Sequence, residues 1–331
     1  MKKVLVTGVS GFVGQHCAVE LLKNGYAVKG SVRSLSRTEE VINGIKKEVD
    51  PKENLEFCEL NLLDDAGWKE AMEGCDYVLH IASPFVIAEP KDENELIKPA
   101  VEGALRALKF AKEAGIKKVV LTSSTVSMAG DKKINHLTQD SWTDAQNDKV
   151  SAYIKSKAMA EKAAWDFYNK QEGDKMELTV VNPGPIYGPT LTGNKSGASM
   201  EMISKIISGE MGAFPKCEYV MSDVRDIAKI HVKALENEAS NGKRFIVTSE
   251  ESHSFVGIAK ILKANGYEKV GTKEAPSFLL KILSNFNSEL KGMKPFIDAK
   301  ITADISETKK TFDWTPMGFE KTILDTAKSL S

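Results

Sequence analysis

Tyr153 and Lys157 are four residues apart in a stretch, residues 152–170, that is predicted to be helical. This spacing places the two side chains on one face of a helix, one turn apart. A free phenol has a pKa of about 10, and a neighbouring ammonium group favours the phenolate, which brings the pKa closer to neutral. The pair therefore suits proton transfer. Alone, the same spacing is also typical of a tyrosine packed above a lysine stem.

Two serines raise the significance of that pair. Ser123 and Ser124 end an apolar run over residues 118–123, and Ser124 precedes Tyr153 by 29 residues. A hydroxyl at the carboxyl end of a strand faces the crevice of an α/β sheet, where it could donate to a substrate carbonyl oxygen while Tyr153 supplies the proton. Ser123 is the close rival of Ser124, because successive residues of a strand face opposite sides.

The elements that must position these side chains alternate along the chain, which predicts parallel βαβ units. The fold class expected is α/β, with a doubly wound, mostly parallel Rossmann sheet and a smaller α/β C-terminal substrate lobe. We predict a dinucleotide domain of residues 1–183 plus about 219–249, and a lobe of about 184–218 and 250–331. Strands are expected at 3–7, 27–32, 55–60, 77–81, 118–123, 178–181 and 245–248, and helices at 12–23, 93–114, 152–170, 200–208, 222–235, 254–265, 275–284 and 318–330.

A glycine turn joins the first strand to the first helix. Gly8 permits a tight turn, Gly11 lets the backbone approach a pyrophosphate, and Gly14 permits close packing of helix and strand. Because the triplet lies between a predicted strand and a predicted helix, it favours a dinucleotide site over a loop without a ligand. The residues of this turn expected to contact the cofactor are Thr7, Gly8, Ser10, Gly11, Phe12, Val13 and Gly14.

The end of the second strand favours NADP (NADPH) over NAD. No carboxylate stands about 20 residues beyond the glycines, where NAD sites usually place one for the ribose 2′-hydroxyl. Arg33 offers a guanidinium that can pair with a 2′-phosphate, with Ser34 and Arg37 as additional donors. A solvated surface charge is the other interpretation, and it fits Arg37 better than Arg33.

Further cofactor contacts are expected where other strands end. Asn61 and Leu62 could border the adenine, although polar residues at strand ends also serve as turn formers. His80 is interpreted as a packed histidine. The contacts expected from the fourth and fifth strands are Ile81, Ala82, Ser83, Thr122 and Ser123.

These motifs together resemble the extended short-chain dehydrogenase/reductase family over nearly the whole chain. Residues 30–34, 82–85, 153–165 and 223–228 are similar to the branch of dihydroflavonol 4-reductases, cinnamoyl reductases and fungal methylglyoxal (aldehyde) reductases. The resemblance implies an NADPH-linked carbonyl reductase with Ser124, Tyr153 and Lys157 as catalytic triad, Lys157 also contacting the nicotinamide ribose. It also implies that Pro183, Gly184, Pro185 and Ile186 border the nicotinamide. The family's frequent Asp after the third strand is Asn61 here, and the family's proton-relay Asn is unassigned.

The substrate is less well defined by the sequence. Apolar residues that could line its pocket are Phe85, Met128, Ile186, Tyr187 and Met202, which favours small to medium apolar carbonyls, although such residues are also common in cores. A sugar epimerase or dehydratase, or a hydroxysteroid-type dehydrogenase, is the alternative on the same scaffold. A non-catalytic NADP sensor would have no need for the triad.

The composition of the chain limits the classes of partner that the protein is expected to bind. The 331 residues have a net charge of -1, which offers no basic field for nucleic acid or an anionic membrane. The longest mostly apolar run, residues 77–88, is too short to span a bilayer, and no secretory signal is visible. Four scattered cysteines indicate buried residues in a reducing compartment, and the five histidines lack the spacing of a metal site. We expect a cytoplasmic monomer or homodimer.

Overall fold

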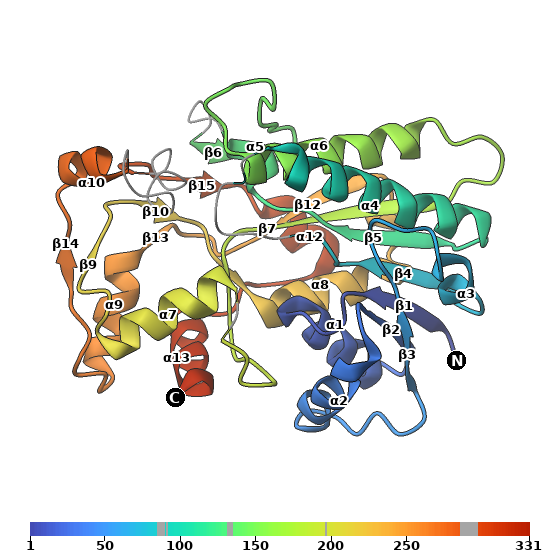
Figure 1. The fold of residues 1–331 in the computed structure, drawn as a ribbon, viewed down its shortest axis with the longest axis horizontal. Helices are drawn as coiled ribbons and strands as arrows, with labels where there is room; N and C mark the ends of the chain where they lie inside the picture. The colour runs from blue at the N-terminus through green and yellow to red at the C-terminus, as the bar shows by residue number, and fades with distance from the viewer. Residues whose placement is uncertain (85–89, 91, 131–134, 196, 285–296) are drawn as a thin grey trace.

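A parallel sheet forms the centre of the protein (Figure 1). The computed structural model describes residues 1–84, 90, 92–130, 135–195, 197–284 and 297–331. Neighbouring strands of this sheet all run parallel. In spatial order they are β12 (Lys243–Val247), β7 (Glu177–Pro183), β5 (Lys118–Thr122), β4 (Tyr77–His80), β1 (Lys3–Thr7), β2 (Ala27–Val32) and β3 (Leu55–Glu59). The chain order reverses between β4 and β1, so a crevice for a ligand is expected where these strands end. The doubly wound α/β prediction is confirmed.

Helices cover both faces of this sheet. On one face lie α1 (Phe12–Lys23), α2 (Thr38–Lys46), α8 (Val224–Glu236) and α12 (Ser306–Phe312); on the other lie α3 (Trp68–Met72), α4 (Asn94–Glu113) and α6 (Ala152–Asn169), with the short α5 (Val126–Ala129) against α6. Alternation along β1 explains the two cores. Val4 and Val6 pack with α1 and α8, whereas Leu5 packs with α3, α4 and α6.

A third apolar cluster lies beyond the carboxyl end of the sheet. It joins α7 (Ala198–Ser208), α9 (Phe255–Ala264) and α13 (Phe319–Leu330), and α10 (Ser277–Leu283) lies further out (Figure 1). The short strands are β6 (His136–Leu137), β8 (Ile186–Tyr187), β9 (Ala213–Phe214), β10 (Glu218–Tyr219), β11 (Ser222–Asp223), β13 (His253–Ser254), β14 (Lys273–Glu274) and β15 (Thr302–Ala303). The predicted boundaries between the two domains stay a prediction, but β12 does return the chain to the main sheet.

The ends of the predicted elements lie within two residues of the observed ones, and β1, α1 and β2 match at both ends. The start of α8, predicted at residue 222, is two residues later in the structure. Asp223 is its N-cap, and the Asp223 carboxylate accepts a hydrogen bond from the Arg225 N–H at 2.8 Å. Ser222 instead pairs with Ile186 in a short parallel ladder. The helices α2, α3, α5 and α12 were not predicted.

The cysteines are only partly as expected. All four are free, but only Cys17 and Cys217 are buried, whereas Cys58 and Cys75 are partly exposed. In the part of the chain that the structure describes, no three His, Cys, Asp or Glu side chains form a group that could hold a metal ion. No helix among the described residues has the length and apolar character needed to cross a bilayer.

Candidate active site

The glycine turn after β1 has the geometry that its residue types require. Gly8 has a φ of 67°, in the left-handed region that favours glycine. A Cβ on Gly14 would lie 2.3 Å from the Gly8 carbonyl oxygen, so only glycine lets α1 approach the turn this closely. Ser31 Oγ accepts a hydrogen bond from the Gly8 N–H at 3.1 Å. The helix α1 begins after Gly11 without a side-chain cap or an acidic residue in its first turn, which leaves N–H groups for an anion.

Thr7 connects the ends of β1 and β4. Its Oγ1 accepts hydrogen bonds from the N–H groups of Ile81 and Ala82, each at 3.0 Å. The Thr7 hydroxyl proton is then directed at His80 Nδ1, 3.0 Å away. Burial lowers the pKa of His80 to about 4, so the imidazole is neutral and serves as an acceptor. His80 is a packed histidine, as the sequence analysis interpreted it.

The three hydrogen-bond donors predicted at the end of β2 differ in the contacts that they make. Arg33 is exposed and forms no hydrogen bond or ion pair with any residue that the structure describes. Ser34 caps a short 3-10 turn by accepting from the Ser36 N–H, and Arg37 pairs with Glu40 at 3.2 Å. Of the three, Arg33 is the side chain that remains available to an incoming anion.

Asn61 and Leu62 both have partners within the protein. Asn61 Oδ1 accepts from the Leu63 N–H at 3.0 Å, which closes a turn after β3. The Leu62 side chain lies against Gly103 of α4, where an added Cβ would be 3.2 Å from it. Asn61 therefore adopts the turn-forming role that was the alternative to an adenine contact.

Tyr153 and Lys157 lie at the beginning of α6, with the spacing that the sequence predicted. Ser151 Oγ caps this helix by accepting from the Ile154 N–H. Lys157 Nζ is 5.9 Å from the centre of the Tyr153 ring and donates to Ser83 Oγ at 2.9 Å. Ser83 follows β4, so this hydrogen bond brings the helix to the end of β4, the neighbour of β1 with its glycine turn.

The pKa expected for Tyr153 was wrong in direction for this structure. Burial raises the pKa of Tyr153 to about 12, and burial lowers the pKa of Lys157 to about 8. Desolvation disfavours the charged form of each group, and it outweighs the attraction that the sequence analysis considered. Tyr153 therefore holds its proton at neutral pH, and Lys157 remains mostly cationic.

The structure distinguishes the two adjacent serines. Ser123 is 7% exposed and its hydroxyl donates to Glu161 Oε2 at 2.5 Å. Ser124 is half-buried; its Oγ accepts from the Val126 N–H at 3.3 Å and lies 3.5 Å from the Pro183 carbonyl oxygen. Ser124 thus has the more accessible hydroxyl at the end of β5.

Other predicted cofactor residues are held by internal contacts. Thr122 Oγ1 lies 2.7 Å from Nε2 of His231 in α8, and since His231 Nδ1 donates to the Ile227 carbonyl, the threonine hydroxyl is the donor. Phe12 packs against the cluster of α7, α9 and α13, and Val13 packs against the α1 and α8 core. The hydroxyl of Thr122 thus faces α8 rather than the glycine turn.

Residues 183–186 lead from the end of β7 into β8 and are hydrogen-bonded to β11. The Gly184 N–H donates to Ser222 Oγ at 2.9 Å, and the Ser222 N–H donates to the Pro185 carbonyl at 2.9 Å. A Cβ on Gly184 would lie 2.4 Å from the Val220 oxygen, which explains the glycine. This segment is held rigidly at the carboxyl edge of the sheet, where the resemblance expects the nicotinamide.

The residues predicted to line the substrate pocket differ in exposure. Met128 and Tyr187 are 0% and 1% exposed, so both are core residues with no surface for a substrate. Met202 is half-buried and packs on the cluster of α7, α9 and α13. Ile186 is also half-buried, and Phe85 lies outside the described residues.

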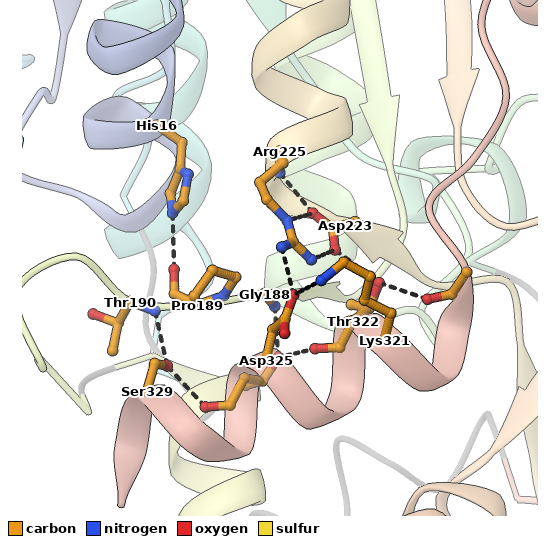
Figure 2. A network of polar contacts seen from close by, with 12 residues as sticks. His16, Gly188, Pro189, Thr190, Asp223, Arg225, Lys321, Thr322, Asp325 and Ser329 are labelled. Carbon is orange, nitrogen blue, oxygen red and sulfur yellow. Dashed lines mark hydrogen bonds and ion pairs between the residues drawn. The ribbon is translucent and has the colours of Figure 1, made fainter. Parts of the chain in front are cut away.

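Two polar networks that the sequence analysis did not identify support this region, although Asp223, Arg225 and Glu161 lie in the stretches 223–228 and 153–165 on which the family resemblance rests. In one, Arg225 pairs with Asp223 at 2.7 Å and with Asp325 of α13 at 2.6 Å (Figure 2). The helix α13 also holds the loop after β8, because the Gly188 N–H donates to Thr326 Oγ1 at 2.7 Å. On the other side of that loop, His16 Nε2 donates to the Pro189 carbonyl at 2.8 Å (Figure 2).

The second network lies under Ser124 and is centred on Glu161, whose side chain is fully buried beside Arg244. The sequence did contain one signal for this network: Glu161 is a charged residue among the alanines on the buried face of α6.

Comparisons with known proteins agree with this architecture. The chain is 32% identical to the NADPH-dependent methylglyoxal reductase of Saccharomyces cerevisiae, over 74% of this chain and 77% of that protein. It is 33% identical to a cinnamoyl-CoA reductase of Medicago truncatula, over 76% and 78% of the two chains. The solved structure of yeast methylglyoxal/isovaleraldehyde reductase complexed with NADPH superimposes with a TM-score of 0.79 at 26% identity, covering 99% of this chain and 98% of that one.

The family assignment rests on the length of the match as well as on the site. Residues 4–247 match the model of the NAD dependent epimerase/dehydratase family, a span that contains the glycine turn, Ser124, Tyr153 and Lys157. With relatives above 30% identity along most of its length, the chain belongs to the NAD dependent epimerase/dehydratase family, the extended short-chain dehydrogenase/reductases that its motifs resemble.

Proposed function

We propose that this protein is an NADP-dependent oxidoreductase that reduces an aldehyde or ketone to the alcohol. The observation that carries the proposal is the hydrogen bond from Lys157 Nζ to Ser83 Oγ at 2.9 Å. It places the helix of Tyr153 against the end of β4, whose neighbours in the sheet are β1 with the glycine turn and β5 with Ser124. A hydroxyl that follows β5 and a phenol and a cation of α6 thus lie at the same edge of the sheet as the glycine turn.

The residues around the turn fit NADPH. The uncapped start of α1 suits a pyrophosphate, and the exposed Arg33 suits a 2′-phosphate. The methylglyoxal reductase of Saccharomyces cerevisiae, one of the relatives, is NADPH-dependent by name. Bound NADPH supplies the hydride.

The chain's own residues supply the proton and hold the carbonyl. Ser124 donates a hydrogen bond to the carbonyl oxygen, where negative charge develops. Tyr153 transfers its proton to that oxygen, which is the direction that a protonated phenol with a pKa of about 12 allows. The Lys157 ammonium stabilises the phenolate that remains. The substrate class that we propose is a small to medium apolar carbonyl.

The experiment that tests the reaction class follows the loss of reduced-nicotinamide absorbance with NADPH and, separately, NADH. The panel contains aldehydes, ketones, diketones and a dihydroflavonol. Turnover that prefers NADPH with any of these carbonyls is the expected result. Binding of both cofactors without turnover of any carbonyl would overturn the proposal, and sugar nucleotides would then be the next panel.

Cofactor choice has a matched pair of variants. Arg33→Ala removes the unpaired guanidinium and should raise the KM for NADPH by about 10-fold to 100-fold, the effect of losing a charge-assisted hydrogen bond, while the KM for NADH stays within about twofold. Arg37→Ala removes a guanidinium already paired with Glu40 and should change either KM by less than about threefold. Equal effects of the two variants on NADPH would contradict the role of Arg33.

The cellular compartment and the oligomeric state are also proposals. The four free cysteines support a reducing compartment, for which we propose the cytoplasm, to be checked by fractionation of the source cells. We propose a monomer or homodimer, which sedimentation at several protein concentrations would distinguish.

A further inference from the structure

A buried ion pair lies under the carboxyl end of β5. Glu161 Oε1 of α6 is 2.7 Å from Arg244 Nε of β12, and the two side chains are 0% and 7% exposed. Desolvating two charges costs about as much as their attraction returns, so a buried pair of this kind is weak evidence for stability. The partners of the pair indicate another role.

The second carboxylate oxygen of Glu161 accepts hydrogen bonds from side chains at the carboxyl ends of β5 and β7, next to the proposed active site. Glu161 Oε2 accepts from Ser123 Oγ at 2.5 Å, from Ser127 Oγ at 2.6 Å and from Asn182 Nδ2 at 2.8 Å. Ser123 and Ser127 flank Ser124, and Asn182 lies on β7 beside it. One carboxylate therefore fixes both sides of the turn that carries Ser124.

The same residues also hold Ser124 directly. Its carbonyl oxygen accepts from the Ser127 backbone N–H at 3.0 Å and from Asn182 Nδ2 at 3.3 Å, while the single Ser127 hydroxyl proton is donated to Glu161. Among the residues that the structure describes, its own hydroxyl has only a 3.5 Å contact to the Pro183 carbonyl and a 3.3 Å contact from the Val126 N–H. The backbone of Ser124 is thus tightly held while its hydroxyl has only long contacts.

Arg244 extends this support to the segment that leads into α6. Arg244 Nη1 donates to the carbonyls of Gln139 and Ser141 at 3.2 and 2.7 Å, and its guanidinium lies 3.8 Å from the centre of the Trp142 ring. Arg244 also donates to Ser127 Oγ at 3.2 Å. The pair therefore joins the turn of Ser124 to the segment that precedes the helix of Tyr153.

We propose that Glu161 and Arg244 are positioning residues, which set the hydroxyl of Ser124 against the phenol of Tyr153 without touching the substrate. This inference rests on the proposed reduction of a carbonyl. A carboxylate is needed because Oε2 accepts three donors while Oε1 faces a cation, whereas a glutamine amide has one acceptor and would direct N–H groups at other donors.

The test is a double-mutant cycle between Glu161→Gln and Ser124→Ala, with kcat from single-turnover oxidation of NADPH. Ser124→Ala should lower kcat about 100-fold, as expected for loss of a donor to the developing oxyanion. Glu161→Gln should lower kcat about 10-fold while the KM for the carbonyl and the Kd for NADPH stay within about twofold. Since Glu161 acts through Ser124, the double variant should match Ser124→Ala within about twofold. Losses that multiply to about 1000-fold would overturn the proposal.

Stability is separated from positioning by two further variants. Lys118→Met removes a buried lysine at the opposite end of β5, where Lys118 Nζ donates to Ser240 Oγ at 2.8 Å, and it should lower the Tm but leave kcat within about twofold. Glu161→Gln combined with Arg244→Met leaves no uncompensated charge and should recover part of the Tm without recovering kcat. Recovery of kcat along with Tm would show that Glu161 only stabilises the fold.

A readout without catalysis keeps this inference apart from the proposed function. In Glu161→Gln, amide hydrogen exchange over residues 123–128 should accelerate about 10-fold or more, while in Lys118→Met it should not. If the wild type reduces no carbonyl, the proposed function fails, and faster exchange would still show that Glu161 holds this turn. Unchanged exchange in Glu161→Gln would overturn the positioning role whatever the wild type reduces.

Discussion

The two ionic networks of this protein differ in how far water reaches them. Glu161 and Arg244 are almost fully buried and join elements of the main sheet and its helices. In the network of Figure 2, Asp223 is buried, but the Arg225 and Asp325 side chains are 23% and 28% exposed, and Lys321 is mostly exposed. The first network has one cation for its carboxylate, whereas the second spreads two carboxylates and two cations along α8 and α13.

The difference in exposure indicates that the two networks have different roles. Partial exposure lets water screen the second network, so breaking it should cost less than breaking the first network, and it should loosen the contact of α13 with the rest of the chain. In the first network, Glu161 would keep its hydrogen-bond donors, but its charge would stay buried without its cation and without water. Carboxylate–cation pairs therefore form a rigid support around Glu161, whereas at α13 they form a weaker contact that water can replace.

The largest effect is expected from Arg244→Met, which leaves Glu161 buried without its cation. The free energy of unfolding should fall by about 3 to 5 kcal/mol, as for other buried pairs that lose one partner. Urea denaturation of the wild type and the variant measures this difference. A loss below about 1 kcal/mol would mean that water reaches Glu161, and the contrast between the two networks would disappear.

A smaller effect is expected from Arg225→Met. Asp223 keeps a hydrogen bond from Thr322 Oγ1 at 2.7 Å and another from the Arg225 backbone N–H. The Arg225 side chain that is removed is 23% exposed, so water can enter its place beside the carboxylate. The free energy of unfolding should fall by about 1 to 3 kcal/mol. The same urea experiment compares the two arginine variants directly, and a larger loss for Arg225→Met than for Arg244→Met would reverse the comparison.

The smallest effect is the acid dependence of the second network. Burial alone would raise the pKa of Asp325, but hydrogen bonds from Lys321 and Arg225 lower it below the usual value. A carboxyl group with a lowered pKa stabilises the fold above its unfolded pKa of about 3.9 and loses this contribution as the pH falls through its folded pKa. Asp325→Asn should therefore be less stable than the wild type by up to about 1 kcal/mol at pH 5, with the difference shrinking towards pH 3. Thermal unfolding at the two pH values measures this, and a constant difference would contradict it.

The first βαβ unit could be predicted from the sequence because its signals are local. Apolar β-branched runs set β1 and β2, and the glycines between them set the start of α1. The spacing of Tyr153 and Lys157 is likewise local, and α6 places both as the helical period requires. The start of α8 lies two residues later than predicted because Ser222 is drawn into a ladder with Ile186, a partner from a distant part of the chain.

Features that depend on burial or on distant partners could not be predicted. Glu161 and Arg244 are 83 residues apart in sequence, and only the sheet order brings their elements together. Met128 and Tyr187 are apolar near the expected pocket, but whether such side chains line a cavity or fill a core depends on neighbours that the sequence does not place. The raised pKa of Tyr153 has the same origin, since desolvation is a property of the packed structure.

The central claim is that Tyr153 supplies the proton in an NADPH-dependent carbonyl reduction. Single-turnover oxidation of NADPH by Tyr153→Phe tests it most directly, with Tyr168→Phe as the matched control, since Tyr168 lies at the other end of α6 and donates to Glu177 at 2.8 Å. Tyr153→Phe should lower the rate at least about 100-fold, the lower range of general acid catalysis, while its Kd for NADPH stays within about threefold. Tyr168→Phe should retain the wild-type rate within about twofold. A Tyr153→Phe variant that reduces the carbonyl at the wild-type rate would contradict the account.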